Sequence, residues 1–316
     1  MRNDNFFGRQ SYISLLEKRI YGLKDGYRQN IAIIGDELVG KTSIMRKLIE
    51  RIADNNFVMF YIEARPESFD SFCRRFIGIL LYSFLLNSGM ELKEDLDFLI
   101  GKSQRHIPNT VAKIRSILVH LQKGKKNDLF SDLLSITESL HQETSKRCVV
   151  FIDEFHNLEN ISLRYLYRDW SKLLISQKNT MYIIASSARH KARNILSSNL
   201  SLLFGNFEII NVEPFDIKTA EDYLCFRFSG AKVDKGLIDF IIHFTGGYPF
   251  YLDIISDALV NTLSKDLTDI LEEMLFEPSG ILNQRFSNYL KRFQDKPKWQ
   301  EYLSILYLIA SGNNKI

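Results

Sequence analysis

Cysteine and histidine are few and scattered in this sequence. The three cysteines, Cys73, Cys148 and Cys225, are far apart, and none belongs to a Cys-x-x-Cys pair. An odd number of dispersed cysteines argues against a disulfide framework and favours a reducing compartment. The six histidines are dispersed as well, so no pattern of zinc ligands is visible. We therefore expect a cytoplasmic protein without structural disulfides.

Long hydrophobic runs are also lacking. The most apolar stretch, residues 76–86, is shorter than the roughly 20 residues that a membrane-spanning helix needs, and Arg74 and Arg75 come directly before it. The polar start, residues 1–5, leads to no apolar segment of the kind found in signal peptides. The sequence thus predicts no membrane partner, and residues 76–86 are interpreted as part of a buried helix.

Neither sign of charge dominates. The chain has 41 lysines and arginines against 38 aspartates and glutamates, a net charge of +3, which is too small to indicate nucleic-acid binding by itself. Apolar residues make up 45% and charged residues 25% of the chain, as in ordinary globular proteins. The length of 316 residues is typical of about two domains.

Short apolar runs alternate with helical segments up to Pro214. The runs that predict buried strands are 31–34, 57–62, 148–152, 181–185 and 207–211. The predicted helical segments are 10–23, 41–53 and 67–88, with a mostly helical stretch over 90–146 that has a polar break at 123–127. This alternation predicts the α/β class, with a parallel sheet covered by helices on both faces. After Pro214 only helical patterns remain, which predicts a second, all-helical domain.

A phosphate-binding loop follows the first predicted strand and opens a helix, with the sequence Gly35-Asp36-Glu37-Leu38-Val39-Gly40-Lys41-Thr42. Its glycines permit a tight turn, so that backbone N–H groups point at phosphate oxygens, and the helix directs its positive end at the same anion. Lys41 is expected to reach the β- and γ-phosphates. The alternative is a chance glycine turn before a helix. The residues predicted to bind the nucleotide here are Gly35, Leu38, Val39, Gly40, Lys41, Thr42 and Ser43.

Two carboxylates follow the third predicted strand, at the edge where open α/β sheets bind ligands. Asp153 is expected to hold Mg²⁺ together with the hydroxyl of Thr42. Glu154 is expected to orient or activate the water that attacks the γ-phosphate. The alternative is a strand that ends in solvated acids. Together with the phosphate-binding loop, the pair predicts an ATPase that uses ATP, ADP and Mg²⁺.

The fourth predicted strand ends in Ser186-Ser187-Ala188-Arg189. Ser187 is placed to lie between Glu154 and the γ-phosphate, and Arg189 to supply positive charge in the transition state. A strand–loop junction with a solvated arginine is an equally open alternative. His156 follows the acids closely; it is a candidate phosphate sensor, although a histidine beside a helix end is the more common arrangement.

These motifs together resemble the AAA+ and STAND branch of P-loop ATPases, and most closely the archaeal-type STAND ATPases. Phe6-Phe7-Gly8-Arg9 is similar to the N-terminal motif of that family, and Thr245-Gly246-Gly247-Tyr248-Pro249 is similar to its Gly-x-Pro motif. The resemblance implies that Arg9 and Pro249 lie beside the base. It also implies a sheet order of 5-1-4-3-2 and a nucleotide held between core and lid.

The domain boundaries expected from the resemblance are a P-loop core at 1–213, with a helical insertion at about 64–146, and a helical lid at 214–296. Residues 297–316 resemble the opening helix of a winged-helix domain, or else form a terminal helix that packs on the lid. One departure from AAA+ rings is that residues 201–206, before the fifth strand, contain no arginine to serve as a finger. This departure argues against a constitutively hydrolysing ring.

Three functions compete. A regulatory ATPase switch that controls a protein partner or self-association is favoured. A DNA-associated AAA+ ATPase, such as a loader, a remodeller or a regulator of transposition or replication, is the main rival, and salt-sensitive DNA binding would reveal it. A module that holds nucleotide without efficient hydrolysis is the third, and Glu154 argues against it. No Asn-Lys-x-Asp motif for guanine is present, which favours ATP.

Overall fold

The computed structural model describes residues 6–90, 92–124, 129–161, 163, 166–200, 206–229, 233–261, 267–294 and 298–312. The chain divides into two compact units. The first consists of Met1–Tyr223 with Ile242–Phe250, and the second of Leu224–Ile241 with Tyr251–Ile316. The predicted domain boundaries at 213 and 296 stay predictions.

A five-stranded sheet forms the centre of the first unit in the described residues, and every strand pair in it is parallel. The order is β2-β3-β4-β1-β5, which is the predicted order 5-1-4-3-2 given from the opposite edge, so the predicted fold class is confirmed. Each predicted strand is present and agrees with its observed range to within a residue at either end. The strands are β1 (Asn30–Ile34), β2 (Phe57–Glu63), β3 (Arg147–Asp153), β4 (Thr180–Ser186) and β5 (Phe207–Asn211).

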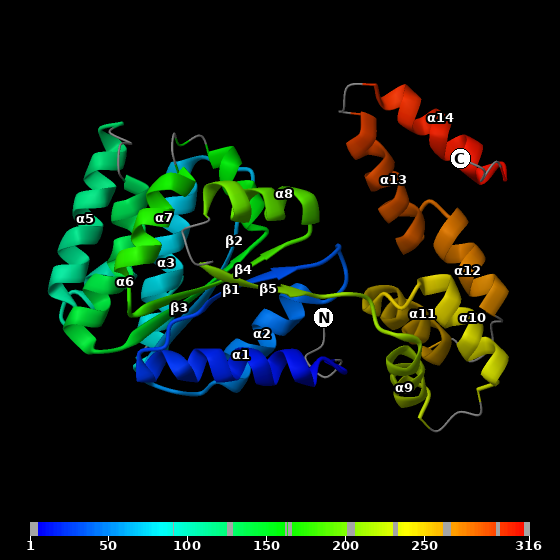
Figure 1. Ribbon diagram of the computed structural model, residues 1–316, viewed down its shortest axis with the longest axis horizontal. Helices are drawn as coiled ribbons and strands as arrows, with labels where there is room; N and C mark the ends of the chain where they lie inside the picture. The colour runs from blue at the N-terminus through cyan, green and yellow to red at the C-terminus, as the bar shows by residue number, and fades with distance from the viewer. Residues whose placement is uncertain are drawn as a thin grey trace. The chain divides into compact units, whose positions relative to one another are not determined.

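The central parts of the strands are apolar, as expected for a sheet with helices on both faces (Figure 1). Ile31 and Ile33 of β1 pack in one core with α1 (Gln10–Gly22) and α2 (Lys41–Arg51). Ala32 and Ile34 point to the opposite face and pack in a larger core with α3 (Phe69–Asn87) and α7 (Leu166–Ser176). Side chains of a strand alternate between faces, so one run of five buried residues supplies both cores.

Two of the helices between β2 and β3 begin at capping side chains. Ser68 accepts a hydrogen bond from Ser71 N at the start of α3, at 3.2 Å, and Asp95 caps the next helix by accepting from Phe98 N at 2.7 Å. Such caps satisfy N–H groups that have no partner inside the helix. The elements of this segment are α3, α4 (Leu96–Ser103), α5 (Pro108–Gln122) and α6 (Leu129–Thr144).

The most apolar stretch of the chain, residues 76–86, lies within α3. Phe76, Ile77, Leu80 and Leu81 are all fully buried, so this run serves the core, as the sequence predicted. Throughout the part of the chain that the structure describes, no helix has the length and apolar character needed to cross a membrane.

The remaining elements of the first unit are short. They are η2 (Leu23–Asp25), η3 (Phe155–Ile161), α8 (Arg189–Asn194) and η4 (Ile195–Asn199), and η3 and α8 directly follow β3 and β4. The strand ends therefore lead at once into turns that carry the predicted site residues.

All the regular secondary structure in the described residues of the second unit is helical, which confirms the predicted helical C-terminal region. Within it, Arg227 forms ion pairs with Asp253, at 3.6 Å, and with Asp257. Its last helix has no buried residue among those described, and the winged-helix interpretation of 297–316 stays a prediction. The helices from Pro214 onward are α9 (Ile217–Arg227), α10 (Lys235–Thr245), α11 (Pro249–Asn261), α12 (Leu267–Phe276), α13 (Ile281–Gln294) and α14 (Trp299–Ala310).

Candidate functional site

The phosphate-binding loop joins β1 to α2, which is the strand–turn–helix arrangement that the motif requires. Leu38 and Gly40 have left-handed φ angles of 70° and 96°, which fold the loop back over the start of α2. Gly35 lies so close to the chain after β5 that a Cβ atom there would meet the carbonyl oxygen of Val212 at 2.2 Å. A side chain is therefore excluded at Gly35 by packing, independently of any ligand.

Replacing Gly35 by Ala should lower the free energy of unfolding by about 1–3 kcal/mol, the usual cost of overpacking. Gly101 is the matched control, because it lies in α4 with nothing within 4 Å of an added Cβ atom. Gly101→Ala should raise the free energy of unfolding by up to about 1 kcal/mol through its helix propensity. Chemical denaturation of both variants measures the difference in their free energies of unfolding. Equal denaturation midpoints would show that Gly35 does not lie as close to Val212 as the structure has it.

Lys41 points back into its own loop. Its side chain is buried, with 4% of the residue exposed, and Nζ donates a hydrogen bond to the carbonyl oxygen of Asp36 at 2.7 Å. Burial lowers the pKa of Lys41, while the carboxylates of Glu154 and Asp153 oppose that shift. The ammonium group is thus held at the loop beside the two strand-end acids. Of the other predicted loop residues, Val39 is buried, and Leu38, Thr42 and Ser43 are half-buried.

Asp153 ends β3 and touches the start of α2. Its Oδ2 accepts hydrogen bonds from the Thr42 hydroxyl at 2.5 Å and from the Tyr61 hydroxyl at 2.8 Å. Burial raises the pKa of Asp153, and these hydrogen bonds oppose the shift. A hydroxyl and a carboxylate in contact form the oxygen-rich donor set that Mg²⁺ prefers, so these side chains fit the predicted cation.

Glu154 has a left-handed backbone, with φ of 48°, which turns its side chain toward β4. Its Oε2 accepts hydrogen bonds from the backbone N and the hydroxyl of Ser187, both at 2.9 Å, and lies 3.2 Å from Nδ1 of His156. Burial acts to raise the pKa of Glu154, but the hydrogen bonds from His156 and Ser187 outweigh it and lower the pKa. The group is therefore an ionised carboxylate fixed at the end of β4.

Arg189 begins α8 and is paired with two carboxylates. Its Nε and Nη2 donate to Asp36 at 2.7 and 3.0 Å, and Nη1 and Nη2 donate to Glu213 at 2.8 and 2.6 Å. The hydrogen bonds to Glu213 are the main cause that raises the pKa of Arg189. The same Asp36 carboxylate accepts a hydrogen bond from the Tyr248 hydroxyl at 3.2 Å. The phosphate-binding loop, α8 and the Gly-Gly-Tyr-Pro turn thus meet at Asp36.

Arg9 contacts the phosphate-binding loop and the segment that follows β5. Its Nη2 donates to the carbonyl oxygen of Val39 at 3.2 Å and to that of Glu213, and its guanidinium lies 4.7 Å from the centre of the Phe215 ring. Phe215 N donates to the carbonyl oxygen of Gly247 at 2.9 Å. Arg9 and the turn before Pro249 are therefore both joined to residues 213–215, and Pro249 itself is the first residue of α11.

The sequence analysis missed the roles of Asp36, Tyr61, Glu213 and Tyr248. Tyr61 had a usable signal, because β2 and β3 are predicted strands and a tyrosine near the end of one can reach the acid that ends its neighbour. Asp36 lies inside the recognised loop. The residues that donate hydrogen bonds to its carboxylate, Arg189 and Tyr248, are 153 and 212 residues away in the sequence. No local pattern indicates those contacts.

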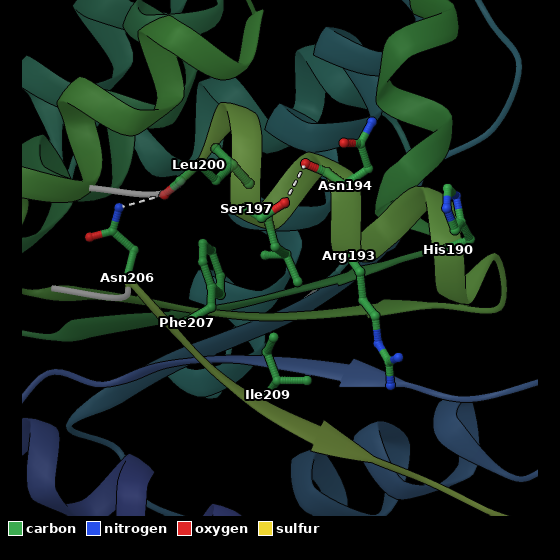
Figure 2. Close-up of a pocket in the computed structure, with 9 residues that line it drawn as sticks. His190, Arg193, Asn194, Ser197, Leu200, Asn206, Phe207 and Ile209 are labelled. Carbon is green, nitrogen blue, oxygen red and sulfur yellow. Dashed lines mark hydrogen bonds between the residues drawn. The ribbon is translucent and has the colours of Figure 1, made fainter. Parts of the chain in front are cut away.

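A groove of about 560 Å³ lies against the edge strand β5 (Figure 2). His190 and Arg193 of α8 line one side, and Phe207 and Ile209 of β5 line the other. Arg193 donates to the side-chain oxygen of Asn211 at 3.1 Å. None of the predicted site residues lines this groove. The candidate nucleotide site is therefore described from the contacts around Lys41 and Asp36 alone.

Comparisons with known proteins agree with this geometry. Residues 6–255 match the model of a family described as an ATPase domain predominantly from Archaea. The Walker-type ATPase of Pyrococcus abyssi superposes with a TM-score of 0.57 at 16% identity, over 92% of this chain and 77% of that one. The ORC1 protein of Aeropyrum pernix, solved in complex with DNA, gives 0.52 at 12% identity, over 98% of this chain and 85% of that one.

No curated protein matches the chain in sequence. The two structural similarities show the fold, and the family match covers most of the chain. With the complete phosphate-binding loop in the matched range, the predicted relationship to archaeal-type P-loop ATPases is confirmed. The chain belongs to the ATPase domain family found predominantly in Archaea, and it is a P-loop ATPase that binds and hydrolyses ATP.

Proposed function

We propose that this ATPase is a regulatory switch of the STAND type, in which the bound nucleotide controls the assembly or release of a protein partner. The observation that carries the proposal is the double engagement of Asp36. This residue belongs to the phosphate-binding loop, yet its carboxylate accepts hydrogen bonds from Arg189 and Tyr248. Tyr248 lies in the turn that leads directly into α11, where the second unit resumes at Tyr251.

The chemical roles in this proposal follow the geometry. The loop backbone and Lys41 hold the phosphates. Thr42 and Asp153 hold Mg²⁺, whose charge would stabilise the phosphate oxygens. Glu154 orients the attacking water from its fixed position at β4. Arg189 supplies positive charge to the γ-phosphate when it exchanges a carboxylate partner for a phosphate oxygen.

The coupling step follows from charge. A nucleotide brings several negative charges to a loop whose Asp36 is already paired with Arg189, so the nucleotide and Asp36 compete for the same guanidinium. A ligand shifts a conformational equilibrium only by contacting one state better than the other. We propose that the favoured state has Arg9, the loop and Pro249 around one nucleotide, with residues 214–296 acting as the lid.

Hydrogen exchange tests the proposal. Residues 245–252 should exchange more slowly with ADP or a non-hydrolysable ATP analogue than without nucleotide. Tyr248→Phe removes the hydroxyl that binds Asp36 and should reduce this protection by roughly two- to tenfold, the size of one hydrogen bond. Tyr27→Phe is the matched control, because Tyr27 is 79% exposed, and Pro249→Ala should weaken the protection as well.

If residues 245–252 exchange identically with and without bound nucleotide, the proposed switch is wrong. The assignment of the chain as an ATPase would not be affected by that result. Duplex DNA is a separate arm of the experiment, since one of the similar structures is of a protein in complex with DNA. Salt-sensitive binding of DNA together with increased ATP turnover would favour a DNA-associated ATPase instead.

A further inference from the structure

The hydrogen bonds to Glu154 fall on one of its two oxygens. Ser187 N, Ser187 Oγ and His156 Nδ1 all approach Oε2, at 2.9, 2.9 and 3.2 Å. Among the residues that the structure describes, none donates a hydrogen bond to Oε1. An ionised carboxylate has acceptor capacity on both oxygens, so Oε1 retains all of its capacity for a water molecule.

His156 is held in place by β4 as well. Its Nδ1 lies 2.9 Å from the Ser186 hydroxyl oxygen, and that oxygen accepts a hydrogen bond from Ala188 N at 3.1 Å. Ser186 is fully buried, and the side chain of His156 is 14% exposed. The imidazole is therefore fixed between the end of β4 and the Glu154 carboxylate.

The proton on Nδ1 follows from the acceptor that it faces. A carboxylate can only accept, so Nδ1 stabilises Glu154 only when it carries hydrogen. A bare Nδ1 would set two lone pairs 3.2 Å apart beside a buried negative charge, which is unfavourable. The hydrogen on Nδ1 then points at Oε2, and the Ser186 oxygen lies close enough to share it.

We propose that His156 is a positioning residue for ATP hydrolysis, which holds Oε2 of Glu154 together with Ser187 so that Oε1 is presented to the attacking water. The inference rests on the proposed role of Glu154 in orienting that water. A glutamate side chain has three rotatable bonds, and a carboxylate displaced by about 1 Å loses much of its effect on a reacting atom. No nucleotide contact is assigned to His156, so it acts through Glu154.

Two variants of His156 separate positioning from packing. His156→Leu keeps an apolar side chain of similar size but removes the donor. His156→Asn places an amide nitrogen two bonds from Cβ, as Nδ1 is, and so keeps the donor. His156→Leu should lower kcat at least tenfold, the loss expected for one hydrogen bond to a charged group. His156→Asn should recover most of that loss, and the Kd for a fluorescent ADP analogue should stay within about twofold in both.

A double-variant cycle shows whether His156 acts through Glu154. In a Glu154→Ala background the carboxylate is absent, so His156→Leu should cause no further fall in the single-turnover rate. An equal fall in both backgrounds, or a His156→Leu enzyme with wild-type kcat, would overturn the inference. If Glu154→Gln itself leaves turnover unchanged, the proposed role of Glu154 fails first, and the two failures are therefore distinguishable.

Discussion

Replacing Glu154 by Gln should lower ATP turnover at least a hundredfold while leaving nucleotide affinity within about threefold of the wild type. General-base or water-orienting groups typically contribute factors of roughly 10²–10⁴. The amide keeps the size of the side chain and one carbonyl oxygen, but it lacks the negative charge that polarises water. The groups expected to bind phosphate, Lys41 and the loop backbone, are unchanged, so the loss should appear in kcat and not in binding.

Single-turnover hydrolysis of ATP and titration with a fluorescent ADP analogue measure the two quantities separately. Glu159→Gln is the matched control, because Glu159 lies in η3 just after Glu154 but pairs with Lys191 at the surface, at 2.8 Å. Exposed pairs of this kind contribute little, so its turnover should equal that of the wild type. Turnover in Glu154→Gln within threefold of wild type would remove this residue from the mechanism.

The centre of the sheet could be predicted because β1, β3 and β4 are buried on both faces. Such strands appear in the sequence as short, continuous apolar runs, and the observed ranges of β3 and β4 extend those runs by one residue at each end. The order of the strands could not be predicted from these runs, because an apolar run does not indicate which strands pair with it in the sheet. That order came from the family resemblance, which rests on motifs and not on periodicity.

The local part of the site was equally predictable. The phosphate-binding loop and the acids after β3 are contiguous in the sequence, because backbone geometry and one strand end create them. The contacts that connect these pieces are not local. Tyr61 reaches Asp153 across 92 residues, and Tyr248 reaches Asp36 across 212. Only the folded chain brings these hydroxyl groups to the acids.

Arg189 illustrates the same limit. Its sequence context left a solvated arginine and a transition-state group equally open. The structure instead pairs its guanidinium with Asp36 and Glu213. Such a residue is preorganised beside the loop, but it must give up part of a bidentate pair before it can contact a phosphate. In the proposed switch, this exchange of partners couples nucleotide binding to the Gly-Gly-Tyr-Pro turn, because Arg189 and Tyr248 share the Asp36 carboxylate.

The largest expected effect on nucleotide binding belongs to Lys41. Lys41→Ala removes a buried cation that is hydrogen-bonded within the loop and is expected to contact the phosphates. Affinity for ATP and ADP should fall at least tenfold, or roughly 1.4 kcal/mol, as expected for the loss of a charge-assisted contact. Lys41→Met tests the charge alone, because it keeps most of the aliphatic chain, and it should lose affinity to a similar extent.

Lys47→Ala is the surface control on the same helix, since Lys47 pairs only with Glu50 among the described residues, at 3.5 Å. Its affinity for nucleotide should be unchanged. Chemical denaturation of every variant without nucleotide is needed as well, because removing Lys41 leaves Asp153 and Glu154 without the cation that now opposes their charge. A Lys41→Met protein that is folded and binds the fluorescent analogue as tightly as wild type would show that this lysine does not contact the phosphates, whatever the loop sequence suggests.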